Sequence, residues 1–561
     1  MTMKLEKAQS SEIMSAVIAA SRLTGWDFIA IAAAVLVLMP LLVLVWTAFG
    51  ANIDTLIHLA RTTLGRVFLE TALFTGGVLV VSLSVGITSG WIVATYRFPG
   101  RTMLGWLLIL PFAVPTYISA YAYVDAMDFF GPVQSAVRQL TGFRTRADYW
   151  FPDMRSREGA IFVTAMVLYP YIYVASRAAF AMQGGNISDA ARSLGCTRLQ
   201  ALRRAVLPAV WPALAAGGTL VLLETLNDVG ASQYLGVETF TVAIFNTWLN
   251  KSNLPGAAQI ALMALAVILA FLWFERWMRS NHRFTLSSRN YRPVTAPRLT
   301  GWRGVTAMLV CAFPVLAGFV LPAAVLLNAA WRQIKEDGVS AELAQALLNT
   351  VFVASLATLV IIMLAMLIAL AQRFARNTLT AGAVRLSILG YAVPGTVLVI
   401  GLLPALGFID MGINDLALAL GGNRIGLVVS GSVIAIVLAY TIRFLAIGVE
   451  QIQGNLGSLS RNTDFAAQTL GCTQQRLALT ILTPAMRPAL AGAAVLIFVD
   501  CLKELPATLL LRPLNFDTLA THLYGHASRG SFEDGALAAL LIVTAGLLPL
   551  AAMNRLMEAK R

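Results

Sequence analysis

The chain has 561 residues, of which 58% are hydrophobic and only 12% are charged, and its mean hydropathy is +0.75. Soluble globular domains carry charge at roughly a quarter of their positions, so these values exclude a soluble fold and indicate a polytopic membrane protein. The net charge of +13 would also suit a nucleic-acid-binding protein. However, the arginines gather in loops between apolar runs, a pattern that sets membrane orientation.

Ten uncharged runs are long enough to cross a hydrocarbon core of about 30 Å, which takes about 20 helical residues. In chain order they are 28–53, 71–96, 102–124, 159–176, 252–274, 304–331, 343–372, 386–409, 425–442 and 535–554. Two shorter runs follow Pro212 and Pro488, and the duplication described below requires both to be helices. The predicted fold is therefore an all-α polytopic membrane protein with twelve transmembrane helices.

Loop charges predict the orientation of these helices. Seven arginines against one acid in residues 275–303 place that loop in the cytoplasm. Both termini of this multi-pass protein are then cytoplasmic. Residues 128–158, predicted to be periplasmic, depart from this rule because they carry five arginines. The four cysteines show no disulfide or metal-binding spacing, which favours small buried thiols.

One polar stretch occurs twice. "SDAARSLGCTRLQALRRAVLPAVWPALA" (188–215) returns as "DFAAQTLGCTQQRLALTILTPAMRPALA" (464–491), 276 residues later. Farther upstream, "FAVP" (112–115) matches "YAVP" (391–394) at an offset of 279. Six helices per copy give both copies the same orientation, so they are parallel repeats related by an axis along the membrane normal.

The duplication gives the expected division of the chain. The parts are a cytoplasmic N-terminal segment 1–26, a first six-helix repeat 27–277 with its polar loop at 186–208, an arginine-rich cytoplasmic linker 278–302, and a second six-helix repeat 303–561 with its polar loop at 462–484.

Each polar element is predicted to be a short helix, a glycine turn and a second capped helix. The expected N-caps of the short helices are Ser188 and Asp464, the turns are Gly195 and Gly471, the caps of the next helices are Thr197 and Thr473, and the breaks or kinks are at Pro208 and Pro484. A short helix with an alanine face suits docking into a groove of a partner. The alternative is an ordinary helical hairpin loop, which the repetition makes less favourable.

This element resembles the Glu-Ala-Ala loop in the permease subunits of binding-protein-dependent ABC importers, with its later Gly and Leu-Pro. The matching residues are Asp189, Ala190, Ala191, Gly195, Leu207 and Pro208 in the first repeat and Ala466, Ala467, Gly471 and Pro484 in the second. Phe465 and Thr483 depart from the pattern. The resemblance implies the type I importer permease fold in a bacterial inner membrane, with the coupling helix of each repeat seated in one of two ATPase subunits.

The chain has no phosphate-binding Gly-x-x-x-x-Gly-Lys-Ser/Thr loop and no Gly-Lys pair at all. ATP is therefore expected to be hydrolysed by a separate subunit, which holds the ATP and Mg. We expect no catalytic residue and no cofactor in this chain.

Acidic residues recur in the fifth helix of each repeat. Glu224 aligns with Asp500 and Asp228 with Glu504, and each i, i+4 pair is expected on one helix face. In a membrane such groups normally face a bundle interior or a wet cavity. They are candidates to line a translocation pathway, with Glu224 and Asp500 as transient ligands of a hard cation. Alternatively, they are the first periplasmic residues, and Lys503 is a salt-bridge partner.

Residues 222–248 and 503–528 are similar to the corresponding stretches of ferric-iron importer permeases, a branch with both halves fused in one chain. This resemblance implies import of Fe3+ from a periplasmic iron-binding protein by alternating access. Related fused permeases carry thiamine or aminoethylphosphonate. His522 and His526 are explained as residues of a polar periplasmic loop. A secondary transporter driven by an ion gradient is disfavoured because it has no use for duplicated docking elements, and a channel or scaffold is less favoured still.

Overall fold

The computed structural model describes residues 24–50, 57–280, 297–336, 338–375 and 377–558. Within these ranges the chain is helical between short connections, and its β contact is an isolated bridge between Arg97 and Arg298. Most of the predicted N-terminal segment 1–26 and of the predicted linker 278–302 lies outside the described residues.

The prediction of twelve membrane-spanning helices is confirmed. Ten described helices are long and apolar enough to cross a membrane, and two bent pairs bring the total to twelve if each pair is one span. Arg101–Ala113 and Thr116–Thr141 meet at 96°, and Gln474–Ala485 and Arg487–Leu502 meet at 72°. The first bend follows from Val114, which is extended, as expected for the residue before a proline.

The chain forms two compact units. One combines residues 1–47 with 349–516, and the other combines 48–348 with 517–561. The units therefore differ from the two sequence repeats, because the first helix is part of the unit that contains most of the second repeat and the last helices are part of the other. The repeat boundaries stay predictions made from the sequence.

The first unit contains α2 (Gly25–Phe49), α16 (Ala341–Phe374), α17 (Thr378–Ser387), η7 (Leu389–Ala392), α18 (Gly395–Ala419), α19 (Val433–Ser458), α20 (Arg461–Thr469), α21 (Gln474–Leu477), η8 (Ala478–Leu482), α22 (Thr483–Ala485), α23 (Arg487–Leu502) and α24 (Pro506–Leu511). The ends of α2 and α16 extend past the unit boundaries at residues 47 and 349.

The second unit contains η1 (Ala60–Leu64), α4 (Gly65–Thr95), α5 (Arg101–Leu107), η2 (Leu110–Ala113), α6 (Thr116–Met127), α7 (Pro132–Thr141), α8 (Arg157–Ser193), α9 (Arg198–Ala201), η3 (Leu202–Val206), α10 (Leu207–Asn227), α11 (Gly230–Tyr234), α12 (Phe240–Phe245), η4 (Asn246–Asn250), α13 (Leu254–Ser280), α14 (Trp302–Val315), η6 (Leu316–Val320), α15 (Leu321–Glu336), α25 (Leu519–Ser528) and α26 (Phe532–Glu558).

Polar and aromatic contacts attach α2 to the first unit. The Trp26 indole N–H donates to Gln474 Oε1 at 3.0 Å, and its ring lies 5.3 Å from that of Phe374. The buried Asp27 carboxylate accepts hydrogen bonds from the side chains of Asn377 and Thr380. These contacts to residues of the same unit make α2 an integral part of it.

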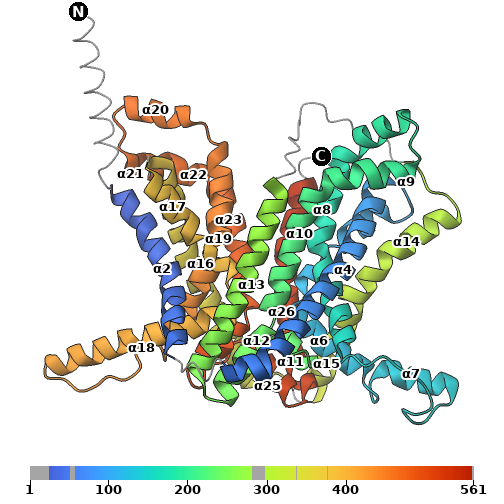
Figure 1. Ribbon diagram of the computed structural model, residues 1–561, viewed down its shortest axis with the longest axis horizontal. Helices are drawn as coiled ribbons and strands as arrows, with labels where there is room; N and C mark the ends of the chain where they lie inside the picture. The colour runs from blue at the N-terminus through green and yellow to red at the C-terminus, as the bar shows by residue number, and fades with distance from the viewer. Residues whose placement is uncertain (1–23, 51–56, 281–296, 337, 376, 559–561) are drawn as a thin grey trace, which may run out of the picture. The chain divides into compact units, whose positions relative to one another are not determined.

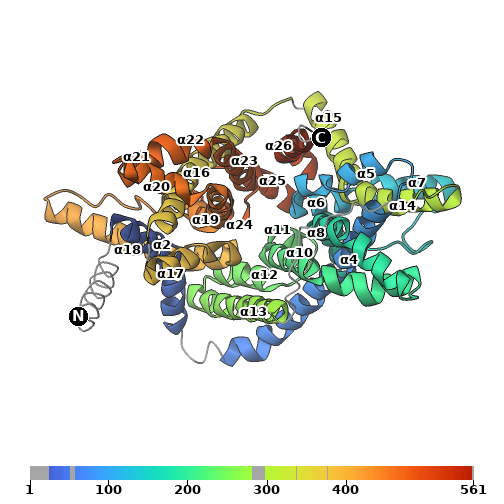
Figure 2. The same ribbon diagram turned by 90° about the horizontal axis from the view of Figure 1, so that it is seen from above.

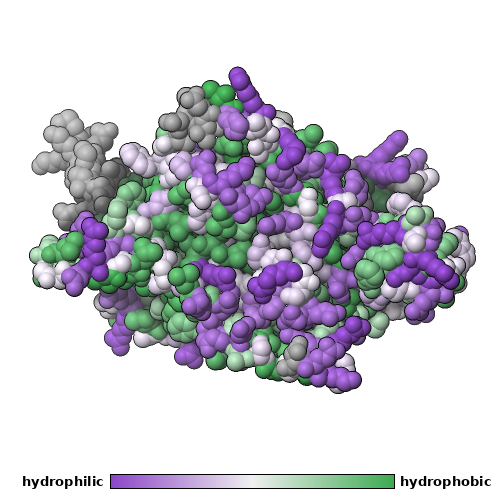
Figure 3. All heavy atoms as spheres, turned by 90° about the horizontal axis from the view of Figure 1, so that it is seen from below, coloured by the Kyte–Doolittle hydropathy of each residue, from purple (hydrophilic) through white to green (hydrophobic). Residues whose placement is uncertain are grey.

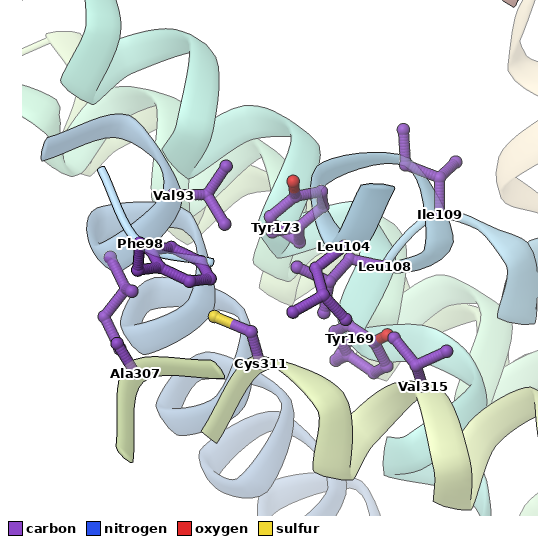
Figure 4. Close-up of a cluster of buried hydrophobic side chains, with 11 residues drawn as sticks. Val93, Phe98, Leu104, Leu108, Ile109, Tyr169, Tyr173, Ala307, Cys311 and Val315 are labelled. Atoms are coloured by element: carbon purple, nitrogen blue, oxygen red, sulfur yellow. The ribbon is translucent and has the colours of Figure 1, made fainter. Parts of the chain in front are cut away.

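In the second unit, α4, α8 and α10 lie side by side (Figures 1 and 2). Figure 4 shows a buried cluster in which Tyr169 and Tyr173 of α8 meet Leu104, Leu108 and Cys311 from α5, its C-terminal turn and α14. The Tyr173 hydroxyl donates to the carbonyl oxygen of Gly105 at 2.9 Å, so this buried aromatic residue keeps its polar atom satisfied. The four cysteines are free thiols; Cys311 and Cys501 are buried as expected, whereas Cys196 and Cys472 beside the glycine turns are half-buried, so the expectation of buried thiols is wrong for these two.

Within the second unit, α9 lies at one end of the helices and α7 and α25 lie at the other (Figure 1). Many hydrophilic side chains cover the face seen from the end that carries α7 (Figure 3). A polar end to a bundle of apolar helices is expected where spans leave the hydrocarbon region.

Candidate functional site

The first polar element is not a separate short helix. Helix α8 runs without a break from Arg157 to Ser193, so Ser188 lies inside it and the N-cap prediction is wrong. Extending an existing helix avoids the cost of a new nucleus, which explains why the membrane helix continues into the polar stretch. Asp189, Ala190 and Ala191 therefore belong to the last turns of α8.

The second polar element is a separate helix, α20, but its N-cap is Ser460, whose side chain accepts from the Asn462 amide. Asp464 lies inside the helix, so its predicted capping role is wrong. Its carboxylate binds the Arg373 guanidinium through two contacts, at 2.8 and 2.9 Å. Arg373 also donates to the carbonyl oxygen of Leu456 at 2.7 Å. This nearly buried ion pair fixes α20 to the end of α16.

The glycine turns and the second caps agree with the predictions. Gly195 and Gly471 have φ values of 87° and 78°, a left-handed conformation that favours glycine. After each turn a threonine caps the next helix, since Thr197 accepts from the Gln200 amide and Thr473 from the Arg476 amide, both at 3.3 Å. The Gln200 side chain accepts in return from the Thr197 amide at 3.0 Å, which completes the predicted capping box.

The two prolines act differently. A wide π turn precedes each, at Leu202–Val206 and Ala478–Leu482, which are 276 residues apart. Helix α10 then continues through Pro208 as part of one span, so the predicted break is absent there. After Pro484 the helix ends at Ala485 and the chain bends by 72° into α23, so the second prediction is confirmed.

Both polar elements present an apolar residue next to the glycine. Leu194 is 85% exposed and Leu470 is 87% exposed, and these leucines are sequence equivalents. Ala190 and Ala466 are also exposed, whereas Ala467 is buried. A repeated leucine on an exposed turn is a favourable contact for a partner groove, because burying it there removes apolar surface from water.

The four acidic residues do not form two helix faces. Helix α10 ends at Asn227 and α23 ends at Leu502, so Asp228 and Glu504 lie beyond the helix ends and the predicted i, i+4 geometry is wrong. Glu224 and Asp228 belong to the second unit, and Asp500 and Glu504 belong to the first. That the four meet at one axis stays a prediction.

The deeper carboxylates, Glu224 and Asp500, are half-buried on their helices. The Tyr171 hydroxyl lies 3.5 Å from Glu224 Oε1. The Lys503 ammonium lies 2.7 Å from Asp500 Oδ1, so the ion pair named as the structural alternative is present. Both carboxylates keep part of their surface open to solvent or to a solute.

Glu504 is buried and ion-paired. Its Oε1 lies 2.8 Å from Arg443 Nη1, and the two side chains are only 4% and 9% exposed. Sequence reasoning did not identify Arg443, although a signal was present. This arginine is the first charged residue after the uncharged run 425–442, and its acidic partner Glu504 lies in the next predicted helix.

The two histidines pack together in α25 with ring centroids 4.6 Å apart. His526 Nδ1 lies 3.3 Å from Ser531 Oγ and 3.7 Å from Asp534 Oδ2. Among the described residues no group of three His, Cys, Asp or Glu side chains is placed to hold a metal ion. This arrangement is typical of a polar helix end.

Arginines of the loop 128–158 bind within their own unit. Arg146 pairs with Asp128 at 3.0 Å, and Arg157 lies 3.3 Å from Glu70. Arg138 lies 4.1 Å from the centre of the Phe129 ring. Backbone amides of Arg144 and Thr145 lower the pKa of the Asp148 carboxyl, so it stays charged beside them. The loop also lines a cavity of about 460 Å³. Its basic residues are thus structural contacts of a folded loop.

The comparisons with known proteins identify the family of this chain. Residues 86–284 match the family model described as binding-protein-dependent transport system inner membrane component. The sulfate transport system permease protein CysT of Salmonella typhimurium is 31% identical over 205 residues, which cover 35% of this chain and 69% of the relative. The chain belongs to this permease family.

A second relative matches both repeats of the permease. The Fe(3+)-transport system permease protein FbpB 2 of Haemophilus influenzae is 24% identical over 518 residues, which cover 91% of this permease and 94% of the relative. The molybdenum transport system permease protein ModB of Escherichia coli is 25% identical over 206 residues, 36% of this permease and 86% of the relative. The permease is thus a multi-pass inner membrane component of a transport system that depends on a binding protein.

The Arg373–Asp464 ion pair gives the first testable prediction for the permease. Asp464→Asn leaves the nearly buried guanidinium without its counter-charge, and breaking such a pair costs about 3–5 kcal/mol. We expect the backbone amides of α20 to exchange with solvent much faster in hydrogen-exchange mass spectrometry, with those of α8 unchanged. Arg461→Ala, a change at an exposed residue of the same helix, is the control. Unchanged exchange in Asp464→Asn would show that the pair does not hold α20.

Proposed function

We propose that this permease forms the transmembrane part of an ATP-driven importer that moves ferric iron, delivered by a periplasmic binding protein, into the cytoplasm by alternating access. The observation that carries the proposal is the similarity to the Fe(3+)-transport permease over 91% of the chain, which includes both repeats. The sulfate and molybdenum relatives match about a third of the chain.

We infer that ATP is hydrolysed by two copies of an ABC ATPase subunit bound at the two polar elements. The exposed Leu194 and Leu470, each beside a left-handed glycine, support such docking. The coupling residues are those of the Glu-Ala-Ala pattern: Asp189, Ala190, Ala191, Gly195, Pro208, Ala466, Ala467, Gly471 and Pro484. ATP and Mg belong to the partner, and both termini face the cytoplasm in this proposal.

The two polar elements differ in how they are attached to the membrane helices, and this difference affects coupling. Helix α20 is a separate helix fixed by an ion pair, whereas its counterpart is the end of the long helix α8. A rigid continuation transmits a push directly to the membrane span. We therefore propose that the two ATPase subunits act on the two repeats through different mechanical connections.

For the solute, we propose a path lined by Glu224, Asp228, Asp500 and Glu504. Glu224 and Asp500 are the transient ligands of the cation, because they are half-buried and keep carboxylate surface available. Carboxylate oxygens suit hard cations. A chain that moved an oxyanion would be expected to present cationic groups at these positions instead.

The second candidate function is import of another solute, either thiamine or aminoethylphosphonate. The latter is supported by a putative 2-aminoethylphosphonate transport system permease protein PhnU of Salmonella paratyphi A, 27% identical over 198 residues. A secondary transporter driven by an ion gradient has no such support.

The deciding experiment is uptake of radioactive ferric iron by cells that carry or lack the gene, with thiamine and 2-aminoethylphosphonate uptake measured in parallel. We expect iron uptake to fall in the deletion strain and to return when the gene is supplied, with the other two unchanged. Unchanged iron uptake would exclude the proposed substrate, and a loss of one of the other solutes would identify the alternative.

A further inference from the structure

Asp228 and Glu504 are equivalent residues with the same local role. They lie 276 positions apart. Asp228 Oδ1 accepts from the Ala231 amide at 2.9 Å, and Glu504 Oε1 accepts from the Ala507 amide at 2.9 Å. Each carboxylate thus begins the short helix that follows its membrane span, α11 or α24.

The two carboxylates differ in counter-charge. Glu504 is neutralised by Arg443. The residue of the first repeat equivalent to Arg443 is Val167, and the register is secure because the helix caps Ser156 and Ser432 are also 276 apart. Asp228 Oδ2 is buried and has no hydrogen-bond partner among the described residues.

A second pair of equivalent residues near the carboxylate also differs between the two repeats. A Cβ atom on Gly395 would lie 2.4 Å from Arg443 Nη1, so the absence of a side chain there makes room for the guanidinium. At the upstream offset of 279, the counterpart of Gly395 is Thr116, whose side chain interacts with the Asp228 carboxylate. The first repeat therefore has Thr and Val where the second has Gly and Arg.

Several hydroxyl groups without partners lie on α6, α8 and α11, three helices of the second unit that pack against one another. Helix α6, which packs against α8 and α11, brings the Tyr121 hydroxyl into electrostatic interaction with Asp228. Tyr121 is 1% exposed. The buried hydroxyl oxygens without a hydrogen-bond partner among the described residues include those of Ser119 and Tyr121 on α6, Thr164 on α8 and Ser232 on α11. Others are those of Thr75 and Tyr169 in this unit and of Thr396 in the first unit.

In the first unit, the residues equivalent to two of these hydroxyl groups have a hydrogen-bond partner. Tyr440 and Thr508, the counterparts of Thr164 and Ser232, hydrogen-bond to each other at 2.5 Å. Buried polar groups are nearly always satisfied, and a group of unsatisfied ones indicates a missing ion or water. Asp228 as a residue is half-buried, but its Oδ2 is buried, and a buried carboxylate oxygen needs a counter-charge most of all.

We propose that Asp228, with the hydroxyl oxygens of Tyr121 and Ser232, forms a cation site in the second unit that binds Fe3+, while Arg443 holds the equivalent position in the first unit permanently. The choice of Fe3+ rests on the proposed function. An all-oxygen ligand set that contains a carboxylate and a phenol selects a hard cation. The Tyr121 phenol loses its proton to the surrounding water when it ligates the ion. Each chain then binds one cation at this position, so the two repeats contribute differently to transport.

The test uses the full chain together with its ATPase subunits in lipid nanodiscs, titrated with radioactive ferric nitrilotriacetate. The wild type is expected to bind one Fe3+ at a saturable site and to show the visible absorption of a phenolate–iron bond. Asp228→Asn and Tyr121→Phe should each weaken binding by at least about tenfold. Tyr123→Phe is the control, because Tyr123 is a buried tyrosine of the same helix whose hydroxyl donates to the carbonyl oxygen of Ala317.

A triple variant copies the second repeat into the first. Thr116→Gly, Val167→Arg and Asp228→Glu together reproduce the set Gly395, Arg443 and Glu504, an arrangement that already folds in this chain. We expect this variant to assemble with the ATPase and to bind no Fe3+, because the new arginine occupies the cation position.

The proposed site is overturned if Asp228→Asn or the triple variant binds Fe3+ as tightly as the wild type. It is also overturned if the wild type binds no Fe3+, even if cells still import iron through the permease. Conversely, if deletion of the gene leaves iron uptake unchanged while the purified chain binds Fe3+ through Asp228, the site stands and the proposed substrate does not. The two failures are therefore distinguishable.

Discussion

Glu504→Gln is expected to destabilise the permease severely. The change removes the negative charge but keeps an oxygen that can accept from the Ala507 amide, so it isolates the ion pair with Arg443. Leaving a buried charge without its partner costs about 3–5 kcal/mol, a large part of the roughly 5–15 kcal/mol that stabilises a typical folded protein. We expect a lower thermal midpoint in detergent and a lower yield of folded protein.

The matched control for Glu504→Gln is the double variant with Arg443→Met, which removes both charges. Neutral replacements of similar volume often leave stability unchanged, so most of the lost stability should return. A single variant as stable as the wild type would contradict the structural role of the pair. A stable double variant that fails to transport would add a role for Glu504 in the path.

Glu224→Ala combined with Asp500→Ala is expected to reduce iron uptake to the level of cells without the gene. Both carboxylates are half-buried on membrane helices, and without them the cation loses the oxygens that replace part of its hydration. Radioactive iron uptake measures the effect, and co-purification of the ATPase checks that the complex still assembles.

The control for this pair is Glu238→Ala, which removes a partly exposed carboxylate paired with Arg66. Exposed ion pairs contribute about 0–1 kcal/mol, so neither uptake nor assembly should change. Normal uptake by the double alanine variant would remove Glu224 and Asp500 from the path. Loss of the ATPase from that variant would point to a structural role instead.

Patterns that depend on local chemistry were predictable from the sequence. Apolar length identified ten spans and the duplication added two, and glycine at positions 195 and 471 identified the left-handed turns. The caps at Thr197 and Thr473 followed from residue type and spacing. In each case the determining interaction lies within a few residues along the chain, so a single sequence contains the information.

Features that depend on distant partners were not predictable in this way. Asp464 has the residue type of an N-cap, but a long-range ion pair with Arg373 determines its position. Ser188 also has the residue type of an N-cap, but helix α8 continues through this position. The i, i+4 spacing of the carboxylates assumed helices that extend to Asp228 and Glu504, whereas the chain turns into α11 and α24 first.

The exchange of helices between the two units bears on how the protein is made. Helix α2 leaves the ribosome long before the rest of its unit, which begins only at Asn349, and the other unit is completed only by α25 and α26. Domains usually fold in order as they are synthesised, but here neither unit can close until nearly the whole chain has been translated. Cutting the gene at the linker would therefore yield two fragments that each lack part of their own core, which gives a physical reason for keeping both repeats in a single polypeptide.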